Sequence, residues 1–174
     1  SGHNLCSFGL DENQDFWTWG NNSYGHQGHG DTTTRYVPTN SSLNSSSSIF
    51  GEDIVHVAAP IGTESYPSLA VLDAGGKVHT AGYNAYGQLG IGNTTNQSNF
   101  VEISPSLLGN VTWLTAGRER YTWYVAVKND GTAYMWGYNG DYQTGTGDTS
   151  NRTSPQIYQY FVDNSIDIVF ARCG

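Results

Sequence analysis

Residues 82–93 read Gly82-Tyr-Asn-Ala-Tyr-Gly-Gln-Leu-Gly-Ile-Gly-Asn93, and this glycine-rich turn decides the fold because it occurs three times. The other two copies span residues 20–31 and 137–148. Each copy follows a short aromatic or apolar stretch, at residues 16–19, 78–81 and 133–136. A strand and turn that recur together indicate a repeat architecture, in which each unit packs on its neighbours. Such an array favours a binding or assembly surface over a single catalytic pocket.

The composition is typical of one all-β domain with many tight turns. The 174 residues include 22 glycines, 12 tyrosines and 5 tryptophans, and only 13% are charged. The net charge of −8 would repel the phosphate backbone of a nucleic acid, so we predict no nucleic-acid binding. No apolar run approaches the length of a bilayer-spanning helix, so we predict no membrane insertion.

The period of the repeat suits a four-stranded propeller blade. The strand ends before the three turns lie at Trp19, Ala81 and Trp136, which are 62 and 55 residues apart. Apolar runs between turn signals predict four strands in each of two periods. In the first period these are residues 53–59, 68–72, 77–81 and 100–103, and in the second they are 111–116, 123–127, 132–136 and 156–161.

The two ends of the chain match the middle of a repeat. Residues 166–174 resemble residues 111–117, and residues 1–10 resemble the segment that follows them. With Gly174 joined to Ser1, the distance to Trp19 would equal that from Gly117 to Trp136. We therefore expect repeats at 1–52 (completed by 165–174), 53–109 and 110–164. Either the ring closes across the chain ends, or a neighbour completes it, or the chain is a three-period window of a longer array.

The repeated unit resembles the repeats of the regulator of chromosome condensation family. Residues 78–92, Val78-His-Thr-Ala-Gly-Tyr-Asn-Ala-Tyr-Gly-Gln-Leu-Gly-Ile-Gly92, carry the best match. Ala116-Gly117 and Ala171-Arg-Cys-Gly174 resemble the element that opens a blade. The resemblance implies a β-propeller that binds other proteins. Some members are exchange factors for small GTPases, and some bind chromatin.

This chain departs from the family in two respects. It has three repeats, fewer than a closed propeller usually needs. Its third turn reads Asp141-Tyr-Gln143 where the family pattern has Tyr-Gly-Gln, and its first reads Tyr24-Gly-His26. Three repeats therefore indicate missing sequence, an open arc, or a ring that a protein partner or copies of the chain itself complete.

The repeated residues are interpreted as structural. Glycines at matching positions of the three turns allow positive φ or a close backbone approach. Trp19 and Trp136 are expected to fill the spaces between blades. The turn glycines assigned this role are Gly20, Gly25, Gly28, Gly82, Gly87, Gly90, Gly137 and Gly145.

Three sets of residues could carry chemistry. His26, His29 and Asp31 could bind a transition metal, but the other two turns lack these histidines, so no metal or other cofactor is predicted. No nucleophile, base and acid stand in a recognisable pattern, which predicts a non-catalytic protein. Cys6 and Cys173 are either two buried thiols or a disulfide across the chain ends, and a disulfide would favour an extracellular or virion setting.

Partner binding is expected at the loops between the first and second strands of each blade. The candidate residues are Glu64, Tyr66, Arg118, Arg120 and Tyr121. Tyr24 and Tyr86, which match each other, are candidates for binding a glycan. The first interpretation of function is a non-catalytic interaction or structural module of an extracellular or virion protein. The alternatives are a GTPase-docking or nucleotide-exchange propeller and a lectin-like propeller.

Overall fold

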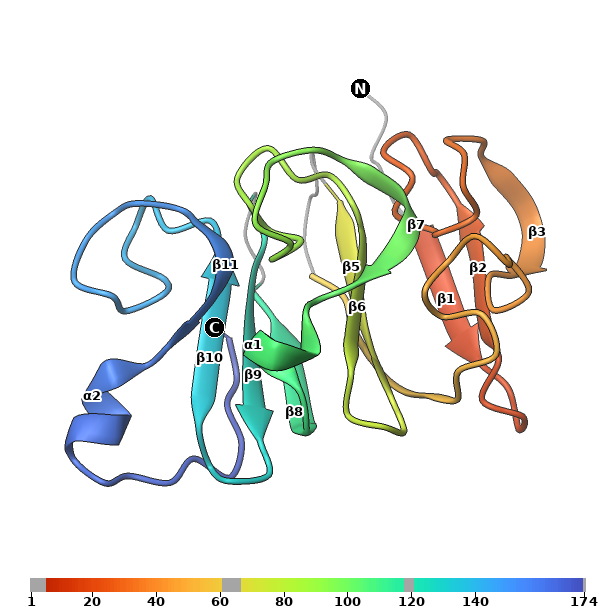
Figure 1. Ribbon diagram of the computed structural model, residues 1–174. Coiled ribbons are helices and arrows are strands. Elements are labelled where there is room, and N and C mark those ends of the chain that lie inside the picture. Colours follow the sequence, from red (N-terminus) through yellow and green to blue (C-terminus); the bar gives the residue numbers. More distant parts are fainter. Residues whose placement is uncertain (1–5, 61–66, 118–120, 174) are drawn as a thin grey trace.

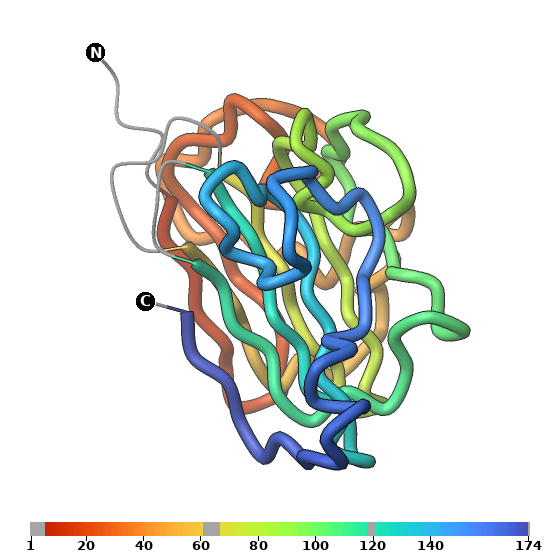
Figure 2. The backbone as a smooth tube through the Cα atoms, turned by 90° about the vertical axis from the view of Figure 1, so that its left-hand side faces the viewer, coloured from red at the N-terminus to blue at the C-terminus, as the bar shows by residue number. Residues whose placement is uncertain are grey.

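A computed structural model describes residues 6–60, 67–117 and 121–173, and it consists of antiparallel sheets standing in a row (Figure 1). Seen along the row, the sheets lie one behind another (Figure 2). This architecture confirms the prediction of propeller-type blades. The first sheet contains β1 (Cys6–Leu10), β2 (Phe16–Gly20) and β3 (Arg35–Asn40). The second contains β4 (Ile54–Ala58), β5 (Ser68–Asp73), β6 (Val78–Gly82) and β7 (Gln97–Glu102), and the third contains β8 (Val111–Ala116), β9 (Trp123–Lys128), β10 (Ala133–Gly137) and β11 (Arg152–Ile157).

The hydrophobic cores lie between neighbouring sheets. Phe16, Leu69 and Phe100 belong to the cluster between the first and second sheets, and Leu114 and Trp136 to the cluster between the second and third. Residues 69–72 of β5 and 123–127 of β9 form continuous apolar runs, as expected for strands whose two faces are both covered. Each fully buried large side chain contributes about 1.5–3 kcal/mol of hydrophobic free energy. The packing between sheets therefore holds the row together.

The last predicted strand, residues 156–161, is wrong in its position. The outer strand β11 ends at Ile157, and α2 (Gln159–Asp163) follows. Tyr158 donates its backbone N–H to Ala133 O, which ends the ladder, and its ring stacks on Phe161 at 4.5 Å. The aromatic side chains that suggested a strand therefore pack on one another in a helical turn. A second short helix, α1 (Pro105–Leu108), precedes β8.

Residues 40–48 contain six serines, a composition that predicts a solvated surface loop, and this prediction is wrong for part of the segment. Ser41, Ser42 and Ser47 are buried. Ser42 Oγ accepts a hydrogen bond from the N–H of Phe16 at 2.9 Å, and Ser41 Oγ donates one to Gln27 O at 2.8 Å. Small hydroxyl side chains let the segment pack closely while satisfying buried polar groups.

The two ends of the described chain lie at opposite ends of the row. β1 belongs to the first sheet, whereas residues 166–173 run beside the third sheet (Figure 1). One chain therefore does not bring these two segments together in this structure. No helix of the described residues is long and apolar enough to span a membrane.

Candidate interaction face

A buried asparagine organises each glycine-rich turn. Asn22, Asn84 and Asn139 occupy the same place in the three turns, and each side chain is fully buried. The Oδ1 atom of Asn84 accepts a hydrogen bond from the N–H of Leu89 at 2.9 Å, and its Nδ2 donates to Asn93 O at 3.0 Å. The other two asparagines make the matching pairs of bonds. Sequence reasoning missed this role, although the asparagine recurs in all three copies of the turn.

The turn glycines stand where a side chain would clash or where φ is positive. All eight predicted turn glycines have positive φ. A Cβ atom on Gly82 would lie 2.6 Å from Pro67 O, and one on Gly90 would lie 2.8 Å from the ring of Trp136. Trp136 is fully buried and donates its Nε1–H to Gln88 O of the preceding repeat at 3.0 Å, whereas Trp19 is half-buried.

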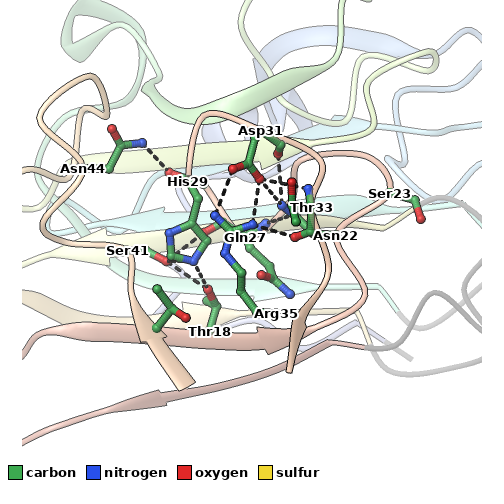
Figure 3. A network of polar contacts seen from close by, with 12 residues as sticks. Thr18, Asn22, Ser23, Gln27, His29, Asp31, Thr33, Arg35, Ser41 and Asn44 are labelled. Carbon is green, nitrogen blue, oxygen red and sulfur yellow. Dashed lines mark hydrogen bonds and ion pairs between the residues drawn. The ribbon is translucent and has the colours of Figure 1, made fainter. Parts of the chain in front are cut away.

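The first turn carries an additional polar network (Figure 3). His29 Nε2 lies 2.9 Å from Thr18 Oγ1 and 3.2 Å from Ser41 Oγ. Arg35 forms a bidentate ion pair with Asp31, which lowers the pKa of that carboxyl to about 2. Burial, aided by the charge of Arg35, lowers the pKa of His29 to about 4. The network therefore links the turn to β2 and to the serine-rich segment. The imidazole of His29 in this network is neutral at pH 7.

His26 is buried in the same turn without a hydrogen-bond partner at either ring nitrogen. Burial lowers its pKa to about 4. His26, His29 and Asp31 do not converge: within the part of the chain that the structure describes, no three His, Cys, Asp or Glu side chains are placed to hold a metal ion. The Cβ atom of His26 instead lies close to Gly82, so the residue sits where two turns meet.

A second buried polar chain links the serine-rich segment to the second sheet. Ser48 Oγ lies 2.8 Å from His79 Nδ1, and His79 Nε2 lies 3.0 Å from Asp73 Oδ2. These are the residue types of a hydrolase triad, but the ring and carboxylate are buried: His79 and Asp73 are 0% and 1% exposed. Sequence reasoning missed this contact because Ser48 and His79 are far apart in the chain. Its role in this structure is to anchor the segment.

Five tyrosines form a continuous cluster across the three repeats. Tyr24 meets Tyr83 with ring centroids 5.1 Å apart, Tyr83 meets Tyr86 at 6.1 Å, and Tyr86 meets Tyr121 at 4.6 Å. Tyr138 completes the cluster, 4.5 Å from Tyr121 and 5.5 Å from Tyr86. All five side chains are half-buried, so each keeps part of its surface exposed. We call residues 24, 83, 86, 121 and 138 the tyrosine cluster.

The tyrosine cluster contains three residues that the sequence had indicated. Tyr121 was a candidate for partner binding, and Tyr24 and Tyr86 were candidates for binding a glycan. Burial raises the pKa of Tyr138, and the charge of Asp141 adds to this effect. The hydroxyl of Tyr138 therefore stays protonated at neutral pH. The other partner-binding candidates, Glu64, Tyr66, Arg118 and Arg120, lie outside the described residues.

A groove of about 460 Å³ runs along β4 and β8, the first strands of the second and third sheets. Its walls are β4, β8 and residues 170–173. The rings of His56 and Trp113 are 5.7 Å apart, and those of Trp113 and Phe170 are 6.2 Å apart. These three side chains form a row along the groove.

The two cysteines are not joined by a disulfide in this structure. Cys6 packs against the core between the first and second sheets, and Cys173 packs against Trp123, Val125 and Met135 of the third. The candidate bond across the chain ends is therefore not formed within one chain. Burial raises the pKa of the Cys173 thiol to about 11, which makes it a poor nucleophile.

Comparison with known proteins identifies the repeat. The family model "Regulator of chromosome condensation (RCC1) repeat" matches residues 15–59 and 130–174. The chain is 34% identical over 137 residues to the probable E3 ubiquitin-protein ligase HERC4 of Homo sapiens, covering 79% of this chain and 12% of that protein. It is 29% identical over 166 residues to the ultraviolet-B receptor UVR8 of Arabidopsis thaliana, covering 94% of this chain and 34% of the receptor.

Solved structures show the same fold. Prp20p from Saccharomyces cerevisiae, described with its binding properties to Gsp1p and histones, superposes with a TM-score of 0.78 at 20% identity, over all of this chain and 40% of that one. Human WBSCR16 superposes with a TM-score of 0.66 at 24% identity, over 87% of this chain and 36% of that one. The chain thus spans well under half the length of each of these proteins.

Proposed function

Because this chain belongs to the regulator of chromosome condensation (RCC1) repeat family, we propose that it is a non-catalytic docking module whose tyrosine cluster binds a protein partner. The observation that supports this proposal is the cluster itself, which joins all three repeats in one half-exposed aromatic surface. Tyrosine is enriched at protein interfaces because it offers a large apolar area and a polar end. Propeller domains of this family act as regulators that bind other proteins, and this surface suits that role.

We place a small GTPase first among the partners. The family resemblance includes nucleotide-exchange factors for small GTPases, and Prp20p, which shares the fold, is described as binding Gsp1p and histones. The comparisons favour this regulatory interpretation over the extracellular or virion one, which was our first interpretation from sequence. The names of these relatives do not refer to glycans, virions or adhesion. The ligase activity named for HERC4 belongs to a protein of which this chain matches 12%.

The test is binding and nucleotide release with a panel of small GTPases. Tyr86 lies at the centre of the cluster, so Tyr86→Ala should weaken binding by roughly 30-fold, the loss typical of an interface hot spot. Tyr36→Ala is the matched control, because Tyr36 on β3 is 92% exposed and lies outside the cluster. Thermal melting of both variants is the control that tests whether each is folded.

Two results separate the parts of this proposal. Equal affinities of the Tyr86→Ala and Tyr36→Ala variants would contradict docking through the tyrosine cluster. Binding of a histone but of no GTPase, with the same loss on Tyr86→Ala, would keep the docking face and remove the GTPase as its partner.

A further inference from the structure

The third glycine-rich turn differs from the other two beside the tyrosine cluster. Its fifth residue is Asp141, whereas the fifth residues of the first and second turns are Tyr24 and Tyr86, which both belong to the cluster. The backbone bond at this position is the same. Asp141 donates its N–H to Gln143 Oε1 at 2.8 Å. Tyr86 likewise donates its N–H to Gln88 Oε1 at 2.9 Å. The third repeat therefore places a carboxylate where the other two place an aromatic ring.

Gly140, which precedes this carboxylate, leaves room for the side chain of Tyr138. A Cβ atom on Gly140 would clash with the hydroxyl oxygen and the ring of Tyr138, so this side chain occupies the space beside the glycine. The matching residues of the other turns are Ser23 and Ala85, which have side chains at this point. The pKa of Tyr138 is raised by burial and then by the negative charge of Asp141. Tyr138 and Asp141 therefore lie together at the third-repeat end of the cluster.

Among the acidic residues of the three turns, Asp141 differs in its charge environment. Asp31 pairs with Arg35 at 2.7 Å, and Asp148 pairs with Arg152 at 2.8 Å. The ion pairs of the described residues do not include Asp141, which is exposed and accepts a hydrogen bond from an amide side chain of its own turn at 3.2 Å. A partner that covered Asp141 without supplying a cation would leave a desolvated, unpaired carboxylate, which is costly.

We propose that the partner places an arginine at this end of the tyrosine cluster, with its guanidinium paired to Asp141 and lying against the ring of Tyr138. This inference rests on the proposed function and adds the chemistry that the docking face selects. A guanidinium is planar, pairs with a carboxylate through two N–H groups and lies flat on an aromatic ring. The hydroxyl oxygen of Tyr138 is a further acceptor for it. Lysine supplies a charge but not this planar contact.

The surrounding charges limit what kind of partner surface fits. Because Asp31 and Asp148 are already paired, the described turns offer one uncompensated carboxylate beside the tyrosine cluster. This arrangement suits one basic side chain at the edge of an apolar contact, rather than a broadly basic surface. A partner with an acidic residue at this point would meet a like charge and be rejected.

The first test uses N-acetyl-arginine amide as its probe, so it does not depend on an identified partner. The full chain carries isotope-labelled tyrosine rings, and their signals are followed by NMR during titration. Tyr138→Phe identifies the signal of Tyr138 by removing it. We expect the arginine probe to shift this signal at concentrations about threefold lower than N-acetyl-lysine amide requires. Asp141→Asn should weaken the effect of the arginine probe by about threefold.

Three further variants separate the charge from the ring. Glu12→Gln is the matched control, because it removes an exposed carboxylate from the hairpin between β1 and β2, at the far end of the first sheet from its glycine-rich turn. It should leave the titration unchanged. Asp141→Tyr restores the residue of the other two repeats and removes the charge, and Gly140→Ala keeps the charge but displaces the Tyr138 side chain. Both of these should weaken the effect of the arginine probe.

The second test uses the GTPase identified by the binding panel. Asp141→Asn should weaken its binding by about fivefold, with a smaller effect at high salt because the pair lies at the edge of the contact. A loss on Tyr86→Ala without one on Asp141→Asn would overturn the arginine contact and keep the docking face. No shift of the Tyr138 signal, or an equal shift in the unmodified chain and Asp141→Asn, would overturn it whether or not a GTPase binds. Failure of the proposed function would instead leave the arginine titration intact while Tyr86→Ala changed no protein binding.

Discussion

At the scale of single residues, His26 is the position where this chain departs most from its own repeat. The matching residues of the other turns are Gln88 and Gln143, whose Oε1 atoms accept hydrogen bonds from the N–H groups of Tyr86 and Asp141. His26 has no partner for either ring nitrogen and is fully buried. An unsatisfied buried polar group costs free energy, and Gln88 leaves one such atom, Nε2, where His26 leaves two. His26 therefore lowers the stability of a turn that forms without it elsewhere in the same chain.

His26 also makes stability depend on pH. In the unfolded chain the imidazole takes up a proton near pH 6.5, but in the folded chain its pKa is about 4. Between these values the unfolded state binds more protons, so the free energy of unfolding falls as the pH falls. The displacement of the pKa corresponds to a loss of about 3 kcal/mol by pH 4.

We predict that His26→Gln raises the free energy of unfolding at pH 7 by about 1 kcal/mol, because the glutamine can accept the N–H of Tyr24 as its counterparts do. The variant should also lose less stability between pH 7 and pH 4.5. Part of the dependence should remain, since burial also lowers the pKa of His29. Urea unfolding across this range measures both effects. An unchanged slope with pH would show that the imidazole of His26 is not buried as described.

At the scale of elements, the third turn contains a backbone strain that the other two avoid. Tyr142 has a φ of 64°, and the residues in its place are Gly25 and Gly87. A non-glycine residue in the left-handed region costs roughly 1–2 kcal/mol. The side chain of Tyr142 is 61% exposed, so its removal sacrifices little packing.

Tyr142→Gly should therefore stabilise the chain by about 0.5–1 kcal/mol, after allowing for the greater entropy of glycine when unfolded. Tyr142→Ala is the control, because it removes the ring and keeps the strain. Thermal or urea unfolding of the two variants should show a gain for glycine alone. Equal stability of the glycine and alanine variants would contradict a strained turn.

The sequence predicted those elements whose residues repeat or alternate. The interior strands were found because they are apolar runs between turn residues, as in β5 and β9. The strand β3 was not predicted: it contains Pro38 and exposed side chains, and it forms through hydrogen bonds to β2 at the edge of its sheet. The burial of the serine-rich segment was missed for a related reason, since its partners His29 and His79 come from other elements.

The candidate site could be predicted only in part. Tyr24, Tyr86 and Tyr121 were recognised from their repeats and their loops, but Tyr83 and Tyr138 were not. Adjacent repeats bring these residues together, although they are far apart in the sequence. A pattern within one repeat carries no information on which side chains of the next repeat will lie beside it.

At the scale of the whole molecule, three sheets stand in a row and one tyrosine cluster joins the three repeats. The relatives that share this fold are more than twice as long as this chain. Aromatic side chains from all three repeats contribute to one half-exposed surface. Docking through the tyrosine cluster is the central claim of this account.

Binding of the Tyr86→Ala variant to a panel of small GTPases, measured beside the Tyr36→Ala control, tests this claim most directly. We predict that Tyr86→Ala weakens binding by roughly 30-fold, because its ring contacts three other tyrosines of the cluster. Tyr36→Ala should leave the affinity unchanged, since Tyr36 lies outside the cluster. Equal affinities of the two folded variants would contradict the account.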